Sequence, residues 1–139
     1  MDSINKSMPG ISDSIVSGDK DYNDAVLLVN EKSYDESMVK AESAGNHYND
    51  SIKKLRDIET KFSSDINDVQ KDYIDTVIKE LDLKLQAVDK LKMSIDCFAV
   101  NSNYTGTNYA SEANDLIYEA NQYQNERDAI VRDNPNLFK

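Results

Sequence analysis

Apolar residues recur at alternating intervals of four and three between Tyr34 and Tyr73. This spacing places side chains on one face of an α-helix. No proline occurs between Pro9 and Pro135, so the residue that most disrupts helices is missing from the middle of the chain. The sequence therefore predicts an all-α fold. The positions that follow the pattern are Tyr34, Met38, Ala41, Tyr48, Ile52, Leu55, Phe62, Ile66, Val69 and Tyr73.

The length and composition favour one domain. A chain of 139 residues is long enough to bury a core without disulfides or a structural metal. Because 39% of the residues are hydrophobic and 30% are charged, each helix is expected to carry one apolar stripe and a wide hydrated face. We predict a single helical-bundle domain over residues 18–139. A flexible polar N-terminal arm over residues 1–17 is expected to precede it, because Pro9-Gly10 is typical of a break.

The apolar periodicity and the capping residues predict an antiparallel up-and-down bundle of about four helices. Ser33 and Glu36 have the spacing of a capping box at the start of the second helix. Pro135 is expected to end the last helix, after which Leu137-Phe138 would fold back on the bundle. The expected ranges are 19–31, 33–62, 65–100 and 107–132.

The point at which the second helix ends has two interpretations. Ser63-Ser64 favours a reversal of the chain, since adjacent serines compete for backbone hydrogen bonds. The apolar stripe nevertheless continues through these serines to Tyr73. The alternative is therefore a continuous coiled-coil helix over residues 33–100, which would make self-association the function to pursue.

The acidic composition argues against several partners. A formal net charge of −10 argues against nucleic acid and anionic membrane surfaces. No stretch approaches the roughly 18 apolar residues of a membrane span, so direct membrane insertion is not expected. The expected compartment is cytoplasmic if Met1 is the natural start, and extracytoplasmic if an export signal has been removed. Three glycosylation sequons favour the second case slightly: Asn5-Lys6-Ser7, Asn49-Asp50-Ser51 and Asn103-Tyr104-Thr105.

Residues that would indicate catalysis or metal binding are isolated in the sequence. His47 is the only histidine, and a histidine-based metal site usually shows clustered ligands. Cys97 stands beside Phe98 at the end of an apolar stripe, where a thiol behaves as a small hydrophobic group. The chain contains neither a nucleophile elbow nor a glycine-rich phosphate loop. We therefore predict no catalytic residues, no metal site, no cofactor and no enzymatic activity.

The polar segment 101–109 is the candidate recognition site. We expect it to form a loop, because it is rich in turn-forming residues. Tyrosine combined with short polar residues gives rigid contact area and adaptable hydrogen bonds. The candidate residues are Tyr104, Thr105, Thr107, Asn108 and Tyr109.

Two functions remain open from the sequence. The first is a non-enzymatic protein-interaction or scaffold module, whose acidic surface meets a protein partner or a second copy of the chain in a homodimer. The alternative is a small-molecule-binding or sensory bundle, such as the extracytoplasmic part of an anchored or exported protein. In that alternative the small molecule would lie near the 101–109 segment, because helical bundles build sites between their helices.

Overall fold

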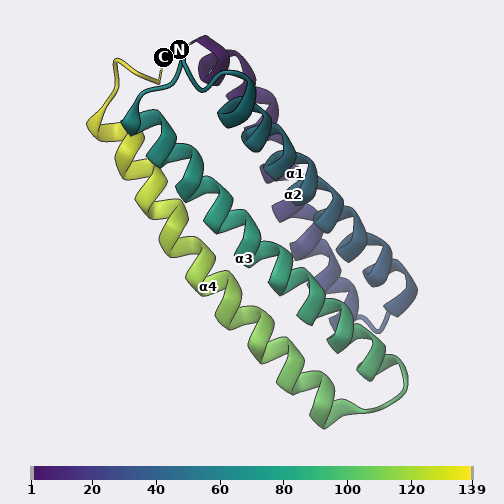
Figure 1. The fold of residues 1–139 in the computed structure, drawn as a ribbon. Helices are drawn as coiled ribbons and strands as arrows, with labels where there is room; N and C mark the ends of the chain where they lie inside the picture. The colour runs from purple at the N-terminus through teal and green to yellow at the C-terminus, as the bar shows by residue number, and fades with distance from the viewer. Residues whose placement is uncertain (1, 139) are drawn as a thin grey trace.

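The chain forms four antiparallel helices arranged as an up-and-down bundle (Figure 1). The computed structural model describes residues 2–138, with side chains from Ile4 onward. The two described ends of the chain lie at the same end of the bundle. The predicted all-α helical bundle is confirmed. The helices are α1 (Asp2–Asn30), α2 (Tyr34–Lys61), α3 (Asp68–Ala99) and α4 (Asn103–Asp133).

Helix α1 begins much earlier than predicted. The interpretation of residues 1–17 as a polar arm is wrong for the described part, since α1 starts at Asp2 and contains Pro9. Ile4, Ile11 and Ile15 are all buried in the core. Proline inside a helix costs about 3 kcal/mol, whereas burial of one isoleucine contributes about 1.5 to 3 kcal/mol. Burial of three isoleucines therefore outweighs the local effect of the proline.

The reversal at Ser63-Ser64 is confirmed, and the continuous helix over residues 33–100 is wrong. The N-cap residue of α3 is Asn67, which the sequence analysis did not identify. Its side chain accepts a hydrogen bond from the Gln70 backbone N–H at 2.9 Å, and Gln70 Oε1 accepts one from the Asn67 N–H at 3.1 Å. This capping box satisfies two N–H groups that a helix start leaves free. The box predicted at Ser33 does not form, because the side chain of Ser33 makes no capping hydrogen bond.

Helix α4 begins at Asn103 rather than at residue 107, so the predicted loop over 101–109 is wrong. The α3–α4 connection is short because Asn101 adopts the left-handed conformation, with φ of 62°. The Ser102 N–H then donates to the Cys97 carbonyl at 2.8 Å, which closes the end of α3 within one turn. At the other end of α4 the chain folds back as expected. The Phe138 ring lies 4.9 Å from that of Tyr73, between centroids.

The bundle consists of two helical hairpins. Helix α1 packs closely on α2, and α3 on α4, while α2 and α3 join the two hairpins. Small buried residues at seven-residue spacing allow the close approach inside each hairpin. Among the described residues, no Cα atom of α1 lies within 8 Å of one in α4, so this side of the bundle is the open one. The small residues are Ser37, Ala44 and Ser51 on α2, and Gly106, Ala113 and Ala120 on α4.

A polar layer crosses the middle of the bundle and contains at least one side chain of every helix. We define it as Asp19 of α1, Tyr48 of α2, Glu80 and Lys84 of α3, and Arg127 of α4. Lys84 Nζ lies 2.9 Å from Asp19 Oδ1 and 2.7 Å from Glu80 Oε2, although the second contact lacks the direction of a hydrogen bond. The Tyr48 hydroxyl donates to Asp19 at 2.6 Å, and Arg127 Nε donates to Glu80.

The layer is balanced in charge, with two carboxylates and two cations. The side chains of Glu80 and Lys84 are 0% and 3% exposed, respectively. Burial and the neighbouring Asp19 carboxylate raise the pKa of Tyr48, so its hydroxyl stays a donor. Burial lowers the pKa of Arg127, but its hydrogen bond with Glu80 and the Glu80 charge raise it above the ordinary value. The layer therefore connects the two hairpins through paired charges.

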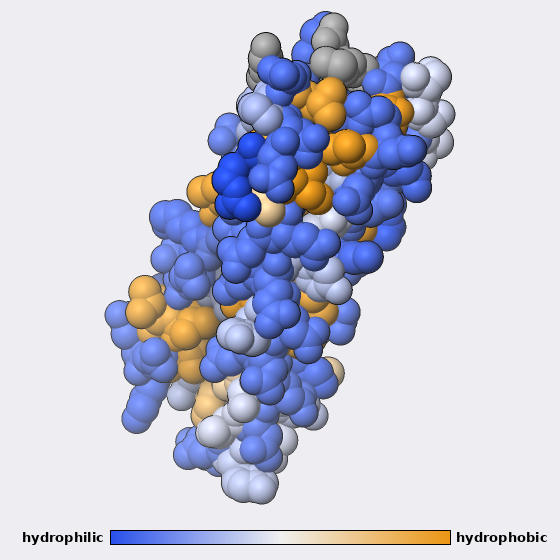
Figure 2. Space-filling view, turned by 90° about the vertical axis from the view of Figure 1, so that its left-hand side faces the viewer, coloured by the Kyte–Doolittle hydropathy of each residue, from blue (hydrophilic) through white to orange (hydrophobic). Residues whose placement is uncertain are grey.

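None of the described helices combines the length and the apolar character needed to cross a membrane. Figure 2 shows one face of the molecule, where hydrophilic surface separates an upper group of apolar patches from a lower one. The lower group lies toward the end of the bundle that carries the α1–α2 and α3–α4 turns.

Candidate functional site

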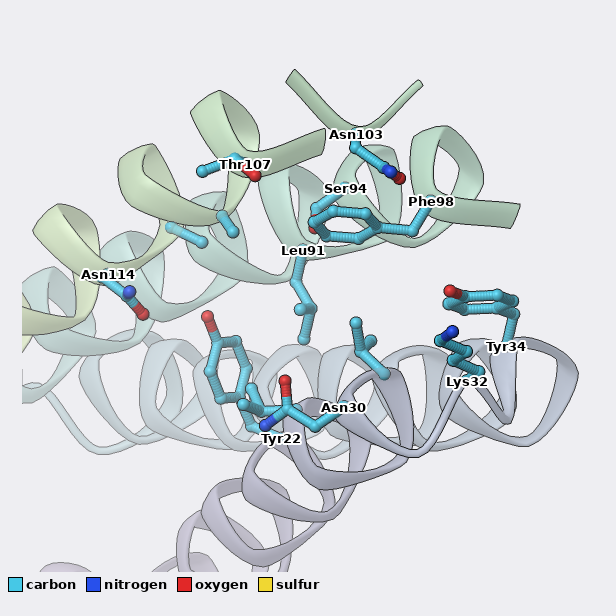
Figure 3. Close-up of a pocket in the computed structure, with 14 residues that line it drawn as sticks. Tyr22, Asn30, Lys32, Tyr34, Leu91, Ser94, Phe98, Asn103, Thr107 and Asn114 are labelled. Atoms are coloured by element: carbon cyan, nitrogen blue, oxygen red, sulfur yellow. The ribbon is translucent and has the colours of Figure 1, made fainter. Parts of the chain in front are cut away.

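A cavity of about 480 Å³ lies between α1, α3 and α4, at the end of the bundle that carries the two short turns. It occupies part of the open side between α1 and α4 (Figure 3). The volume is within the range of sites that hold small organic ligands. Its lining residues are Tyr22, Val26, Val29, Asn30, Lys32, Tyr34, Leu91, Ser94, Phe98, Asn103, Thr107, Ala110, Ala113 and Asn114.

The cavity exists because the first half of α4 carries small side chains. Ala110 and Ala113 face the space, and Gly106 precedes them on the same helix. A Cβ atom on Gly106 would lie 3.1 Å from the Phe98 ring, so the glycine lets this ring lie against α4. Further along α4, Ile130 and Val131 pack against the core. The difference in side-chain size leaves space at one end of the helix and fills it at the other.

Ser94 of α3 is the feature of the cavity that packing does not explain. Its residue is 1% exposed, and its Oγ has no hydrogen-bond partner. A buried hydroxyl without a partner costs about 1 to 3 kcal/mol. Another small polar residue, Ser37 of α2, is also buried, but its Oγ donates to the Ala25 carbonyl at 2.7 Å. Ser94 therefore has an unused donor and acceptor in the wall of the cavity.

Uncharged polar groups surround an apolar floor. Figure 3 shows the Tyr22 hydroxyl and the Asn114 carboxamide pointing into the same space from α1 and α4. Burial raises the pKa of Tyr22 to about 12, so this hydroxyl is neutral near neutral pH. Such groups orient a ligand by hydrogen bonds, whereas the apolar floor supplies contact area. The floor consists of Val26, Val29, Leu91, Phe98, Ala110 and Ala113.

Among the described residues that line the cavity, Lys32, in the turn between α1 and α2, is the only charged one. It has φ of 64° and ends α1 in the same manner as Asn101 ends α3. The Ser33 N–H donates to the Leu28 carbonyl at 2.8 Å, which fixes this turn. Figure 3 places Lys32 and Tyr34 at one end of the lining and Asn114 at the other.

The structure brings one of the predicted recognition residues to the cavity. Thr105, Thr107 and Asn108 are all exposed on the first turns of α4, and Thr107 alone among them is part of the lining. Tyr104 is 82% exposed. Tyr109 is half-buried, with Lys90 Nζ 5.5 Å above its ring. The predicted segment therefore borders the site, but it does not form it.

The sequence analysis missed the residues that α1 and α3 contribute, above all Tyr22 and Ser94. One signal was present for Ser94. It lies seven residues after the buried Ala87, so it occupies a core position of α3, where a polar residue is unusual. Tyr22 gave no such signal, because a tyrosine on an apolar stripe is ordinary at the edge of a core.

Other positions of the molecule give weaker evidence of a functional site. A second cavity, of about 440 Å³, lies between α1 and α2 near Phe62, and none of the described residues that line it is a buried side chain with an unsatisfied polar atom. His47 Nε2 lies 3.5 Å from Asp21 Oδ2 on the surface of the bundle. Cys97 is half-buried. Within residues 2–138, no group of three or more His, Cys, Asp or Glu side chains is arranged to hold a metal ion.

Comparison of the chain with protein-family models, with curated proteins and with solved structures found no match. The fold and the site thus define the protein by class alone. It is a four-helix bundle made of two hairpins, with a ligand-sized cavity between α1, α3 and α4.

Proposed function

We propose that the chain is a binding module, which holds a small molecule in the cavity between α1, α3 and α4. The observation that carries this proposal is the Ser94 hydroxyl, which is buried, unpaired and part of the cavity lining. Evolved cores rarely keep such a group without a use for it. A ligand atom bonded to Ser94 Oγ would remove the cost of burying it.

The lining favours binding over catalysis. The described residues of the lining include no histidine, cysteine, aspartate or glutamate, which are the usual acid–base and nucleophilic groups. Ser94 has no base within hydrogen-bonding distance among the described residues, so its hydroxyl is not activated as a nucleophile. The proposed function agrees with the alternative drawn from the sequence, in which a small molecule lies near the start of α4.

The test uses 1-anilinonaphthalene-8-sulfonate, a dye that fluoresces on entering apolar sites. We expect saturable binding of one dye molecule per chain. The Ala110→Phe variant should lose this binding, because the larger side chain occupies the cavity. Ala129→Phe is the matched control, since Ala129 is a half-buried alanine of α4 outside the cavity lining. Equal dye binding by wild type and Ala110→Phe, with near-UV circular dichroism showing both folded, would contradict the proposal.

A further inference from the structure

The charges around the cavity indicate which ligands it can hold. The chain has 26 acidic residues among 139, yet none of the carboxylates that the structure describes lines the cavity. A cationic ligand would therefore lose part of its hydration without gaining a counter-charge, which is unfavourable. Lys32 is the only charged group of the lining, and no described carboxylate forms an ion pair with it. The lining thus disfavours a cation and favours an anion.

The backbone at Lys32 supports a role for this side chain. The left-handed conformation that ends α1 is strained for most residues, and glycine or asparagine is the usual choice. The matching turn after α3 follows that rule with Asn101, whereas the first turn has Lys32 at a φ of 64°. A strained residue at the edge of a cavity is a reason to look for a function. At Lys32 that function is its ammonium group.

The shape of the cavity indicates the shape of the ligand. From Asn103 to Asn114 the lining extends along α4 by about 16 Å, at roughly 1.5 Å per residue. We infer that the ligand is an elongated organic anion: its carboxylate pairs with Lys32, its apolar body lies on Leu91 and Phe98, and a hydrogen-bonding group reaches Ser94. This inference rests on the function proposed above and adds the chemical class of the ligand.

Three probes of the same shape test the charge preference on the full chain. They are 3-phenylpropionate, 3-phenylpropanamide and 3-phenylpropylamine, which near neutral pH are an anion, a neutral molecule and a cation. Dissociation constants come from chemical-shift titrations by nuclear magnetic resonance. We expect the carboxylate to bind about tenfold more tightly than the amide, since a charged hydrogen bond contributes about 1.5 to 3 kcal/mol. The amine should bind most weakly.

The Lys32→Asn variant then assigns the preference to one residue. Asparagine adopts the left-handed conformation more readily, so this variant should fold and melt at a higher temperature than the wild type. It should bind the carboxylate and the amide with similar affinity. The matched control is Lys53→Gln, which removes an exposed lysine of α2 outside the cavity and should keep the preference.

The outcomes separate the ligand class from the proposed function. If the dye binds but the amine or the amide equals the carboxylate, the anion assignment is wrong and the binding function stands. The assignment is also wrong if Lys32→Asn keeps the preference, or if none of the three probes binds while the dye does. Failure of both the probes and the dye would overturn the binding function together with the ligand class.

Discussion

The polar layer and the cavity are two places where this bundle buries polar side chains, and they differ in how those groups are paired. In the layer, the buried ammonium of Lys84 contacts two carboxylates, and the Tyr48 hydroxyl donates to one of them. In the cavity, Ser94 Oγ has no partner. A satisfied polar group can hold elements together. An unsatisfied one beside open space instead indicates a site for a ligand.

The largest effect is expected in the layer. Lys84→Met leaves Asp19 and Glu80 without the ammonium that lies between them, so the free energy of unfolding should fall by about 3 to 5 kcal/mol. Urea denaturation followed by circular dichroism measures this loss. The matched control is Lys20→Met, which breaks an exposed pair with Asp24 at the same i,i+4 spacing and should hardly move the midpoint. Equal losses in the two variants would mean that the layer does not join the hairpins.

Two glycines extend the comparison to packing. A Cβ on Gly18 would lie 2.7 Å from the Tyr48 ring, which the layer fixes, so Gly18→Ala should cost about 1 to 3 kcal/mol. In Gly106→Ala the Phe98 ring can move into the cavity, and the gain of about 1 kcal/mol in helix propensity should roughly offset that shift.

Thermal and urea denaturation of both variants measure the difference. Gly10→Ala serves as the reference for propensity alone, because nothing lies within 4 Å of the added atom. It should stabilise α1 by about 0.5 to 1 kcal/mol. If Gly106→Ala lost as much stability as Gly18→Ala, the Phe98 ring would not be able to move into the cavity to make room for the added methyl group.

Two buried serines give a smaller effect of opposite sign. Ser94→Ala removes an unpaired hydroxyl and should raise the free energy of unfolding by about 1 kcal/mol, while it weakens dye binding. Ser37→Ala breaks the hydrogen bond to Ala25 and should lower the free energy of unfolding by about 1 kcal/mol, with dye binding unchanged. Denaturation and dye titration on the two variants check both signs. Destabilisation by Ser94→Ala would show that its hydroxyl has a partner in solution.

The sequence predicted much of the fold because apolar periodicity shows which face of a helix is buried. It also located the reversal at Ser63-Ser64. It failed at the starts of α1 and α4, where Pro9 and the turn-forming residues 103–109 gave local signals that tertiary burial and a compact turn outweighed. Periodicity does not show which helices face each other across the bundle, so the cavity between α1 and α4 could not be predicted.

The polar layer, too, could not be predicted from local sequence patterns. Nothing in the sequence sets Glu80 and Lys84 apart from the charged residues of the hydrated faces, since such residues are rarely buried. Their burial depends on Arg127, which lies 47 residues beyond Glu80 in the chain. No local pattern connects residues so far apart. The predicted role as an acidic module for a protein partner, or for a second copy of the chain, is not tested by the fold and stays a prediction.

The smallest effect concerns a carboxylate that, unlike Glu80, faces another carboxylate. Burial first, and then the hydrogen bond and charge of Asp75, raise the pKa of Glu59 to about 7, against an ordinary value of 4.5, although Lys71 and Arg56 lower it. Between pH 4.5 and about 7 the folded state therefore holds this proton more tightly than the unfolded chain. Glu59 thus supports stability at acidic pH, and that contribution is lost as the pH rises through about 7.

Glu59→Gln should remove this dependence. Below pH 4.5 the variant and the wild type should denature alike, because Glu59 is protonated in both states. Above about pH 7 the variant should be the more stable, since it buries no ionised carboxylate beside Asp75. Urea midpoints measured across this range check the prediction, with Glu42→Gln as the exposed control on α2. A constant difference between variant and wild type at every pH would show that Glu59 keeps its ordinary pKa and that its proton is not coupled to folding.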